Sequence, residues 1–361
     1  MKRFYLNIII FFIIITLSSC GKPSPKYYRY EYNGYLDTVG YIIVEYDQNK
    51  YSLSEVREIL KNAEEVLLNV EKEFSIEQTP YMKALGIEKS TLMKINENSG
   101  KNIPVKVSDE FLEILKLAFD MYIYTDGLFD VTIGSLTTLW EISNKAEYCM
   151  NDLESLEYLC SIPSDEEIEK AKSKIDFNKI NVNYEEKTVL LEEEGMMLDF
   201  GAIGKGFAAE KIAEFLSNYD FPYIIINMGG NVKTIGLPNV STSPLKIYVD
   251  NPFGEGTIGY YNPKVNTGGV TSGVYERYIN YQGVKYHHIL NPKTGYPCND
   301  DVVSVTIEGI DSSMADALST SVFMLGAEEG LKLINLLDGY EAVIITKEKQ
   351  VYVSNNLDFI Q

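Results

Sequence analysis

The stretch that most constrains this chain is a glycine-rich junction at residues 198–212, with the sequence LDFGAIGKGFAAEKI. It follows an apolar run and opens a helix-like segment, and three glycines and one lysine lie between Gly201 and Gly206. Glycines let backbone N–H groups approach an anion, and a helix start adds unpaired donors and positive dipole. The pattern predicts a phosphate-binding loop to which Lys205 adds a full charge. Many glycine-rich turns only connect two elements, so this simpler reading stays open.

The start of the chain is typical of an exported protein. Met1-Lys2-Arg3 precedes the almost wholly apolar residues 4–17, and the small residues Ser18 and Ser19 precede Cys20. The apolar run is too short to span a membrane comfortably. The ending resembles the lipobox of bacterial lipoproteins, which implies a signal peptide at 1–19, lipid on the Cys20 thiol and a tether at 20–26. We expect residues 27–361 to form a domain lipid-anchored on the extracytoplasmic face of the cell membrane; an uncleaved signal anchor is the alternative.

The charge of the chain limits its partners. The 361 residues carry a net charge of −20, and removal of Lys2 and Arg3 with the signal takes away two positive charges and leaves −22. Such an acidic protein repels nucleic acid and anionic lipid, so an anionic ligand must be held by local donors or by a metal. We therefore expect a cation at any phosphate site.

The cysteines argue against a zinc cluster. Besides Cys20 there are Cys149, Cys160 and Cys298, with no CxxC pair and only two histidines. Cys149 and Cys160 fall in one acidic, uneven excursion at 144–174, and for a protein outside the cytosol a local disulfide between them is one of two open alternatives.

Hydrophobic periodicity predicts a chain that mixes strands and helices. The predicted strands lie at 27–46 (a pair), 182–191, 195–199, 223–227, 247–250, 257–261, 267–273, 275–281 with 284–290 (a hairpin), and 342–345 with 351–354. The predicted helices lie at 52–74, from Ser108 onward, at 165–173, 205–218, 313–325 and 327–337. One large domain or two closely joined ones fit this length.

Two further segments carry polar groups suited to a site. The turn Gly127–Asp130 lies in TDGLFDVT and could hold a planar ligand, or it could be a tight turn around a core phenylalanine. Asp316, Ser319 and Thr320 are spaced i, i+3 and i+4, which puts a carboxylate and two hydroxyls on one helix face. Such oxygens suit magnesium or calcium. A solvated face is the alternative, although apolar neighbours make the helix look buried.

Both histidines lie on the second arm of the predicted hairpin. His287 and His288 are successive strand residues and must face opposite sides, so only one of them can point into a given site. The Pro/Gly turn 291–295 follows them.

Six of these motifs occur together in the order seen in one family. DFGAIGKGFAAEKI, INMGGNV, TSGVYERY, HHILNPKTG and ADALSTSVFMLG, with GLFDVTIGSLTTLW before them, resemble the ApbE family of FAD-dependent protein flavin transferases. The resemblance covers about residue 37 to the end. It implies an α+β fold of mixed sheets with flanking helices, FAD in a central cleft, and Mg²⁺ between the pyrophosphate and the protein.

The resemblance also implies roles for individual residues. It assigns metal ligation to Ala202 through its carbonyl, to Asp316 and Thr320, and as a further candidate to Ser319. It assigns FAD contacts to Gly127, Leu128, Phe129, Asp130, Asp199, Lys205, His288 and Ile289.

The implied reaction is transfer of FMN from FAD to a threonine or serine hydroxyl of another protein, with release of AMP. Asp316 with Mg²⁺ would neutralise the pyrophosphate, Lys205 would help to position it, and His288, with an ordinary pKa near 6.5, would take the hydroxyl proton. Each of these residues also has a structural alternative: His288 could be a packing residue, Lys205 a solvated lysine at a helix start, and Asp316 a solvated carboxylate on a helix face.

Two other functions stay open. A magnesium-dependent FAD pyrophosphatase would use water in place of the protein hydroxyl and give FMN and AMP. A lipid-anchored flavin-binding or solute-binding protein would perform no chemistry. For a transferase, the expected acceptor is an extracytoplasmic electron-transfer subunit.

Overall fold

The computed structural model describes residues 26–36, 38–150, 160–238, 245–298 and 301–361. The predicted signal peptide, Cys20 and all but the last residue of the tether lie outside these ranges. In the described ranges, every helix is either too short or too polar to cross a membrane.

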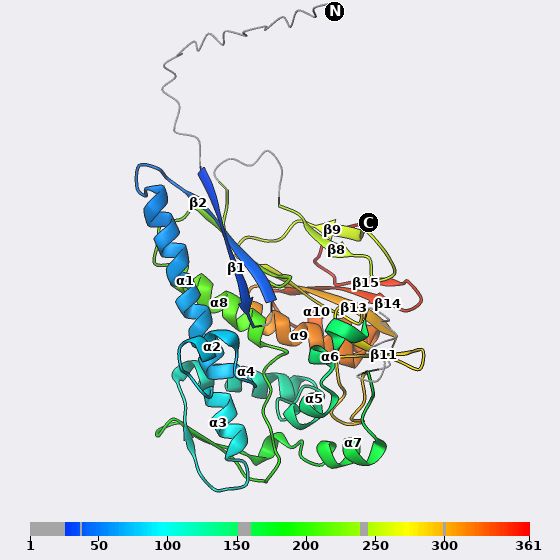
Figure 1. The fold of residues 1–361 in the computed structure, drawn as a ribbon. Coiled ribbons are helices and arrows are strands. Elements are labelled where there is room, and N and C mark those ends of the chain that lie inside the picture. The colour runs from blue at the N-terminus through cyan, green and yellow to red at the C-terminus, as the bar shows by residue number, and fades with distance from the viewer. Residues whose placement is uncertain (1–25, 37, 151–159, 239–244, 299–300) are drawn as a thin grey trace, which may run out of the picture.

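An eight-stranded antiparallel sheet forms the centre of the fold (Figure 1). Its order is β1 (Lys26–Tyr35), β2 (Thr38–Tyr46), β6 (Tyr223–Met228), β7 (Asn231–Gly236), β10 (Gly268–Gly273), β13 (Val302–Gly309), β14 (Tyr340–Thr346) and β15 (Val351–Val353). The sequence patterns predicted all of these strands except β7 and β13.

Three smaller sheets surround it. They are β16 (Phe359–Ile360), β9 (Thr257–Tyr261) and β8 (Ile247–Asp250); β3 (Val105–Lys106), β5 (Thr188–Leu191) and β4 (Ile180–Asn183); and the hairpin β11 (Tyr278–Tyr281) with β12 (Val284–His287). The predicted hairpin turn is confirmed, with Gln282 and Gly283 at φ of 50° and 77°.

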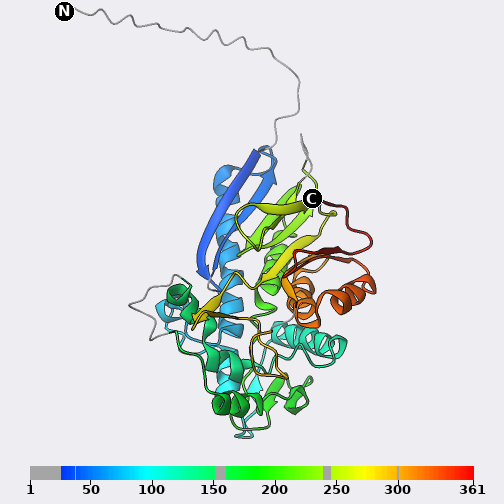
Figure 2. The same cartoon turned by 90° about the vertical axis from the view of Figure 1, so that its right-hand side faces the viewer.

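Four helices lie along one face of the central sheet (Figure 1): α1 (Leu53–Phe74), α8 (Gly204–Leu216), α9 (Ser312–Leu325) and α10 (Ala327–Asn335). The strands β8 and β9 cover part of the other face through a small apolar cluster. The view in Figure 2 shows the remaining helices gathered below the central sheet and the layers that cover it. They are α2 (Pro80–Ala84), α3 (Thr91–Glu97), α4 (Asp109–Tyr124), α5 (Gly134–Trp140), α6 (Ile142–Cys149), α7 (Asp165–Lys172) and a 3₁₀ turn at Phe177–Lys179.

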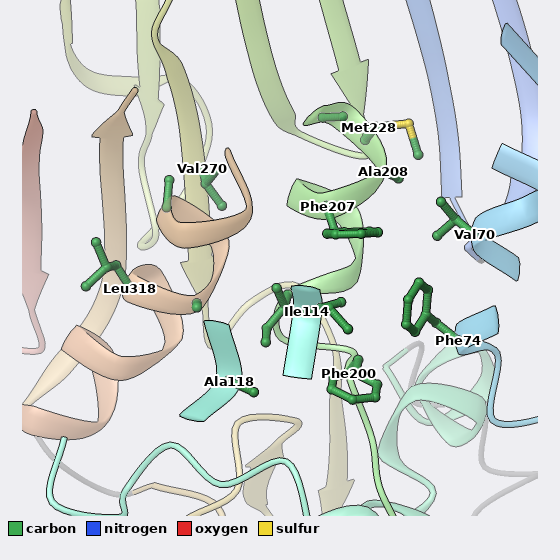
Figure 3. Close-up of a cluster of buried hydrophobic side chains, with 14 of the residues drawn as sticks. Val70, Phe74, Ile114, Ala118, Phe200, Phe207, Ala208, Met228, Val270 and Leu318 are labelled. Carbon is green, nitrogen blue, oxygen red and sulfur yellow. The ribbon is translucent and has the colours of Figure 1, made fainter. Parts of the chain in front are cut away.

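The main hydrophobic core joins the helical layer to the sheet. In Figure 3, Phe74 of α1 lies near Phe200 and Phe207, with ring centroids 5.7 Å and 5.4 Å apart. Ile114 of α4 and Leu318 of α9 belong to the same cluster. This core therefore holds the start of α8 against α1, α4 and α9.

A second, separate core lies under α5, α6 and the β11–β12 hairpin. Its buried residues include Leu136, Trp140, Ile142, Ile168 and Leu290, together with Cys149 and Cys160.

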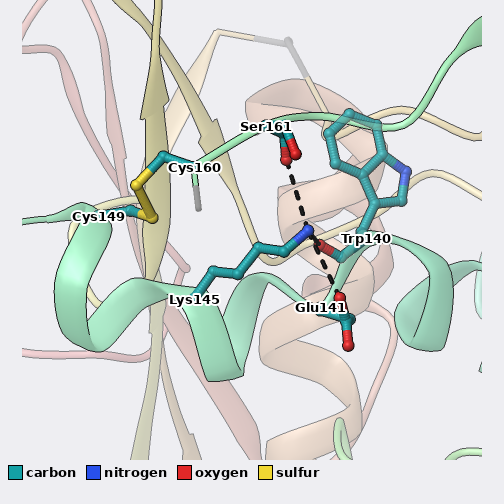
Figure 4. Close-up of a disulfide and its surroundings, with 6 residues drawn as sticks. All are labelled: Trp140, Glu141, Lys145, Cys149, Cys160 and Ser161. Carbon is teal, nitrogen blue, oxygen red and sulfur yellow. Dashed lines mark hydrogen bonds and ion pairs between the residues drawn. A yellow bond between two sulfur atoms is a disulfide. The ribbon is translucent and has the colours of Figure 1, made fainter. Parts of the chain in front are cut away.

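A disulfide joins Cys149 to Cys160, which settles the alternative that the sequence left open (Figure 4). Beside it, Lys145 Nζ donates to the carbonyl oxygens of Trp140 at 3.3 Å and Ser161 at 3.4 Å, and pairs with Glu141 at 3.5 Å. These bonds attach α6 to the chain on both sides of it.

The strand predicted at 195–199 is wrong. The N–H of Leu198 donates to Asn96 Oδ1 at 2.8 Å, and the Leu198 carbonyl accepts from Asn96 Nδ2 at 3.0 Å. The N–H of Asp199 donates to the Val131 carbonyl at 2.8 Å. The backbone bonds of this apolar segment therefore go to a side chain and a loop in place of a sheet.

Candidate functional site

A cavity of about 420 Å³ lies where the two cores meet. Its walls come from residues 128–133, the helices α5 and α6, the loop 199–205, the end of β10 with residues 276–277, residues 288–290, and α9. This volume is within the range of about 300–1,000 Å³ that is common for small-molecule sites.

The helices α8 and α9 touch at the cavity because Gly206 has no side chain. A Cβ at this position would lie 2.0 Å from the carbonyl oxygen of Ser312. The close approach lets the N–H of Gly206 donate to Asp316 Oδ2 at 2.9 Å. The first turn of α8 is thus bound to a carboxylate of α9.

Asp316 is a buried carboxylate on the cavity wall, with 3% of its surface exposed. Burial raises the pKa of Asp316, while the positive charge of Lys205 and the N–H of Gly206 oppose this rise. Lys205 Nζ lies 4.0 Å from Asp316 Oδ1. Both side chains border the same space, so neither is the solvated surface group that was the alternative.

The two hydroxyls predicted beside Asp316 differ in position. Thr320 borders the cavity, as does Ala202. Ser319 does not border it; this residue is fully buried, its Oγ donates to the Asp316 carbonyl at 2.8 Å, and it lies 2.7 Å from Ser272 Oγ.

The cavity lining is acidic. It contains the six carboxylate residues Glu77, Asp130, Glu141, Asp199, Glu276 and Asp316, against the two permanent cations Lys205 and Arg277. Among the described residues, three or more His, Cys, Asp or Glu side chains nowhere gather into a metal cluster. A cation here would therefore depend on the Asp316 carboxylate, the Thr320 hydroxyl and the Ala202 carbonyl. Such hard oxygen donors fit Mg²⁺.

His288 borders the cavity, and a hydrogen bond determines which of its ring nitrogens carries the proton. Its Nδ1 lies 3.2 Å from the carbonyl oxygen of Arg277. A carbonyl can only accept, so Nδ1 carries the proton and Nε2 keeps its lone pair. Burial lowers the pKa of His288 to about 3, and the positive charges of Arg277 and Lys205 add to the lowering.

His287 points away from the cavity, as strand alternation predicted. Its Nε2 lies 2.6 Å from the Cys298 carbonyl, and its ring contacts Phe323. Burial lowers the pKa of His287 to about 4. This histidine has the packing role that was the alternative for its neighbour.

Three of the four residues predicted to line the flavin border the cavity: Leu128, Phe129 and Asp130. Phe129 is also a core residue, in agreement with the alternative of a turn around a core phenylalanine. The fourth, Gly127, does not border the cavity; its φ is +75° and its N–H donates to the Tyr122 carbonyl at 2.9 Å, which ends α4. Asp130 Oδ1 accepts from the N–H and the hydroxyl of Thr132 at 2.8 Å and 2.7 Å.

Asp199 borders the cavity and connects two of its walls. Its Oδ1 accepts from the N–H of Gly201 at 2.7 Å, and its Oδ2 accepts from Thr137 Oγ1 at 2.6 Å. Ile289, the last of the predicted FAD contacts, also borders the cavity.

Several lining residues had no role assigned from the sequence. Ser272, Glu276 and Arg277 lie in TSGVYERY, one of the six motifs that carry the family resemblance. The sequence analysis assigned no function to the residues of this motif. The sequence signal was therefore present for these three. The same holds for Trp140, which ends the GLFDVTIGSLTTLW motif. For residues 141–144 there was no such signal, because none of the six motifs covers them.

A family model and several known proteins match most of this chain. The sequence model of the ApbE family matches residues 41–344. A protein of Klebsiella pneumoniae strain 342, named FAD:protein FMN transferase, is 30% identical over 266 residues, which is 74% of this chain and 78% of that protein. One of the same name from Treponema pallidum strain Nichols is 30% identical over 306 residues, 81% of each chain.

Solved structures show the same fold. The ApbE protein from Thermotoga maritima superposes with a TM-score of 0.74 at 30% identity, covering 91% of this chain and 97% of that one. The flavin transferase ApbE from Vibrio cholerae superposes with a TM-score of 0.76 at 22% identity, covering 92% and 98%. The predicted α+β fold of mixed sheets and flanking helices is confirmed.

Proposed function

The chain belongs to the ApbE family, and we propose that it transfers FMN from FAD to a threonine or serine hydroxyl of another protein and releases AMP. Relatives from Klebsiella and Treponema that carry the name FAD:protein FMN transferase support this proposal.

The observation that carries the proposal is the meeting of three groups in one cavity. Lys205 comes from the start of α8, His288 directly follows β12, and Asp316 comes from α9. An anchored cation, a neutral imidazole and a buried carboxylate are what attack on a phosphorus atom requires: charge neutralisation, positioning and a proton acceptor.

The acidic lining explains why Mg²⁺ belongs to the proposal. A pyrophosphate would be repelled by the carboxylates unless a divalent cation lay between them. Asp316, Thr320 and the Ala202 carbonyl would hold Mg²⁺, which when bound would neutralise the phosphate oxygens. Lys205 would bind a further phosphate oxygen, and Asp199 and the wall Leu128–Asp130 would bind the remainder of FAD.

His288 would take the proton at Nε2. The acceptor oxygen forms a bond to the FMN phosphorus, the bond from that phosphorus to the AMP oxygen breaks, and the hydroxyl proton moves to the imidazole. A bound anionic ligand raises the pKa of a neighbouring imidazole, which brings His288 closer to the range of an effective base.

The place of the reaction is part of the proposal. A lipid on Cys20 would hold the enzyme at the extracytoplasmic face of the membrane, beside electron-transfer subunits that we propose as acceptors. Labelling of the full-length protein with a radioactive fatty acid tests this anchor, because Cys20→Ala should remove the label.

The test of the reaction uses the protein from Gly21 onward, incubated with FAD and Mg²⁺ with and without an acceptor domain. AMP release together with flavin fluorescence on the acceptor is the expected result. Equal AMP and FMN with or without the acceptor would point to a pyrophosphatase. FAD retention without AMP would leave a flavin-binding protein.

A further inference from the structure

A chain of three hydroxyl groups runs from the cavity wall into α9. Ser272 lies on β10 and borders the cavity, and its Oγ is 2.7 Å from Ser319 Oγ and 3.4 Å from Thr320 Oγ1. The Oγ of Ser319 in turn donates to the carbonyl oxygen of Asp316 at 2.8 Å. We propose that Ser272 is a positioning residue that orients the Thr320 hydroxyl for a cation.

The direction of each hydrogen bond follows from the number of protons. A hydroxyl has one proton, and a carbonyl can only accept. Ser319 uses its proton on the Asp316 carbonyl, so the short contact with Ser272 requires the Ser272 proton. Ser272 then has only lone pairs left, and the Thr320 proton points to it.

The consequence is that the lone pairs of Thr320 are left for the cavity. Without Ser272, the Thr320 proton could turn toward the cavity, where it would repel a cation. The inference rests on the proposed function, in which Thr320 binds Mg²⁺. It also explains why Ser319 shares the helix face of Asp316 without bordering the cavity: it connects Ser272 to the backbone of α9.

Burial makes this arrangement hard for water to replace. Ser319 is fully buried and Ser272 is 8% exposed. Ser272 is also fixed in the central sheet, where β10 pairs with β13 and Ser272 stands opposite Val305. A rigid strand therefore sets the position of the first hydroxyl, as supporting groups around metal ligands commonly do.

The test measures binding of Mg²⁺ alone, from the rise in the unfolding temperature with Mg²⁺ concentration in the absence of FAD. Ser272→Ala should weaken Mg²⁺ binding by about 10- to 100-fold, the usual effect of losing a group that orients a metal ligand. Ser319→Ala should have a similar effect. The double variant should be no worse than either single one, because both break the same chain.

The matched control is Ser321→Ala. Ser321 is also fully buried in α9, but its Oγ donates to the Ala317 carbonyl at 2.7 Å and it does not border the cavity. Its loss should leave Mg²⁺ binding unchanged. Equal Mg²⁺ affinity of the wild type and of both serine variants would overturn the inference while leaving the proposed function intact. Failure of the wild type to bind Mg²⁺ would overturn the metal in the proposed function and this inference with it.

Discussion

His287 and His288 are adjacent, yet their ring protons lie on opposite nitrogens. His287 donates from Nε2 to the Cys298 carbonyl, and His288 donates from Nδ1 to the Arg277 carbonyl. Two backbone carbonyls thus select two tautomers in succession. Only His288 presents an unprotonated Nε2 beside the cavity, and so only this histidine can act as a base there.

Replacement of His288 tests that role. His288→Gln should lower kcat for FMN transfer by about 10²- to 10⁴-fold, the usual contribution of a general base. The KM for FAD should change little. In the wild type, the acid limb of kcat/KM should lie well below pH 6.5, because the pKa of His288 is lowered to about 3 before FAD binds. An acid limb near pH 6.5 that vanishes in the variant would contradict the pKa assignment.

The metal site makes a prediction for Asp316. Asp316→Ala should reduce magnesium-dependent AMP release by at least about 100-fold, since it removes the charged ligand of the site. Asp358→Asn, on an exposed residue near the end of the chain, is the control and should keep full activity. Unchanged turnover in Asp316→Ala would rule out the assigned metal site.

The crossing of α8 and α9 depends on one glycine. Gly206→Ala should lower the free energy of unfolding by about 1–3 kcal/mol, because the added methyl group would collide with the Ser312 carbonyl. It should also weaken Mg²⁺ binding by moving Asp316. Gly204→Ala is a matched control in the same turn, since a Cβ there meets nothing within 4 Å. Equal unfolding temperatures for the two variants would show that the helices can separate without cost.

The disulfide makes a prediction about the second core. It closes a short loop, with a sequence separation of 11, next to the cavity wall formed by α6. Reduction, or the double change Cys149→Ser and Cys160→Ser, should cost about 2–4 kcal/mol and raise the KM for FAD. The double variant should not respond to dithiothreitol. A KM that dithiothreitol leaves unchanged in the wild type would show that α6 keeps its place without the bond.

The lowered pKa of His287 leads to a prediction of how the stability of the fold depends on pH. The pKa of His287 falls from 6.5 to about 4 on folding, so between these values the unfolded chain binds more protons than the folded one. Its contribution to stability is complete above about pH 6.5 and is lost as the pH falls toward 4. Urea unfolding of His287→Gln should show a slope with pH that is smaller by up to about 1.4 kcal/mol per unit in this window. A slope equal to that of the wild type would argue against the buried neutral form.

Local rules predicted most elements of the fold. Ser52 forms a capping box at the start of α1, and Gly326 ends α9 at a φ of 82°. Such signals depend on neighbours in sequence. The strands β7 and β13 were not predicted, although residues 303–308 of β13 read VSVTIE and alternate apolar and polar residues as a half-buried strand does. All eight residues of β13 are buried, its polar ones included, and the sequence pattern does not report this burial.

The sequence predicted the site residues whose role follows from their own side chain. It did not predict the residues whose role depends on a contact with a distant part of the chain. Lys205, His288 and Asp316 were found by residue type and motif, and all three border the cavity. Ser319 was grouped with Thr320 by helical spacing, which does not tell which hydroxyl faces the cavity. The role of Ser272 depends on a contact 47 residues away in the chain, and no local pattern reports it.

The cavity lies between two cores that do not share side chains. Phe129 and Met324 of its wall belong to the main core, and Trp140 and Leu290 belong to the second. A ligand that fills the cavity therefore touches both, and its binding energy opposes the opening of whichever core unfolds first. The empty protein should then melt in two calorimetric steps that merge into one as the cavity fills, so that the substrate itself makes the fold cooperative.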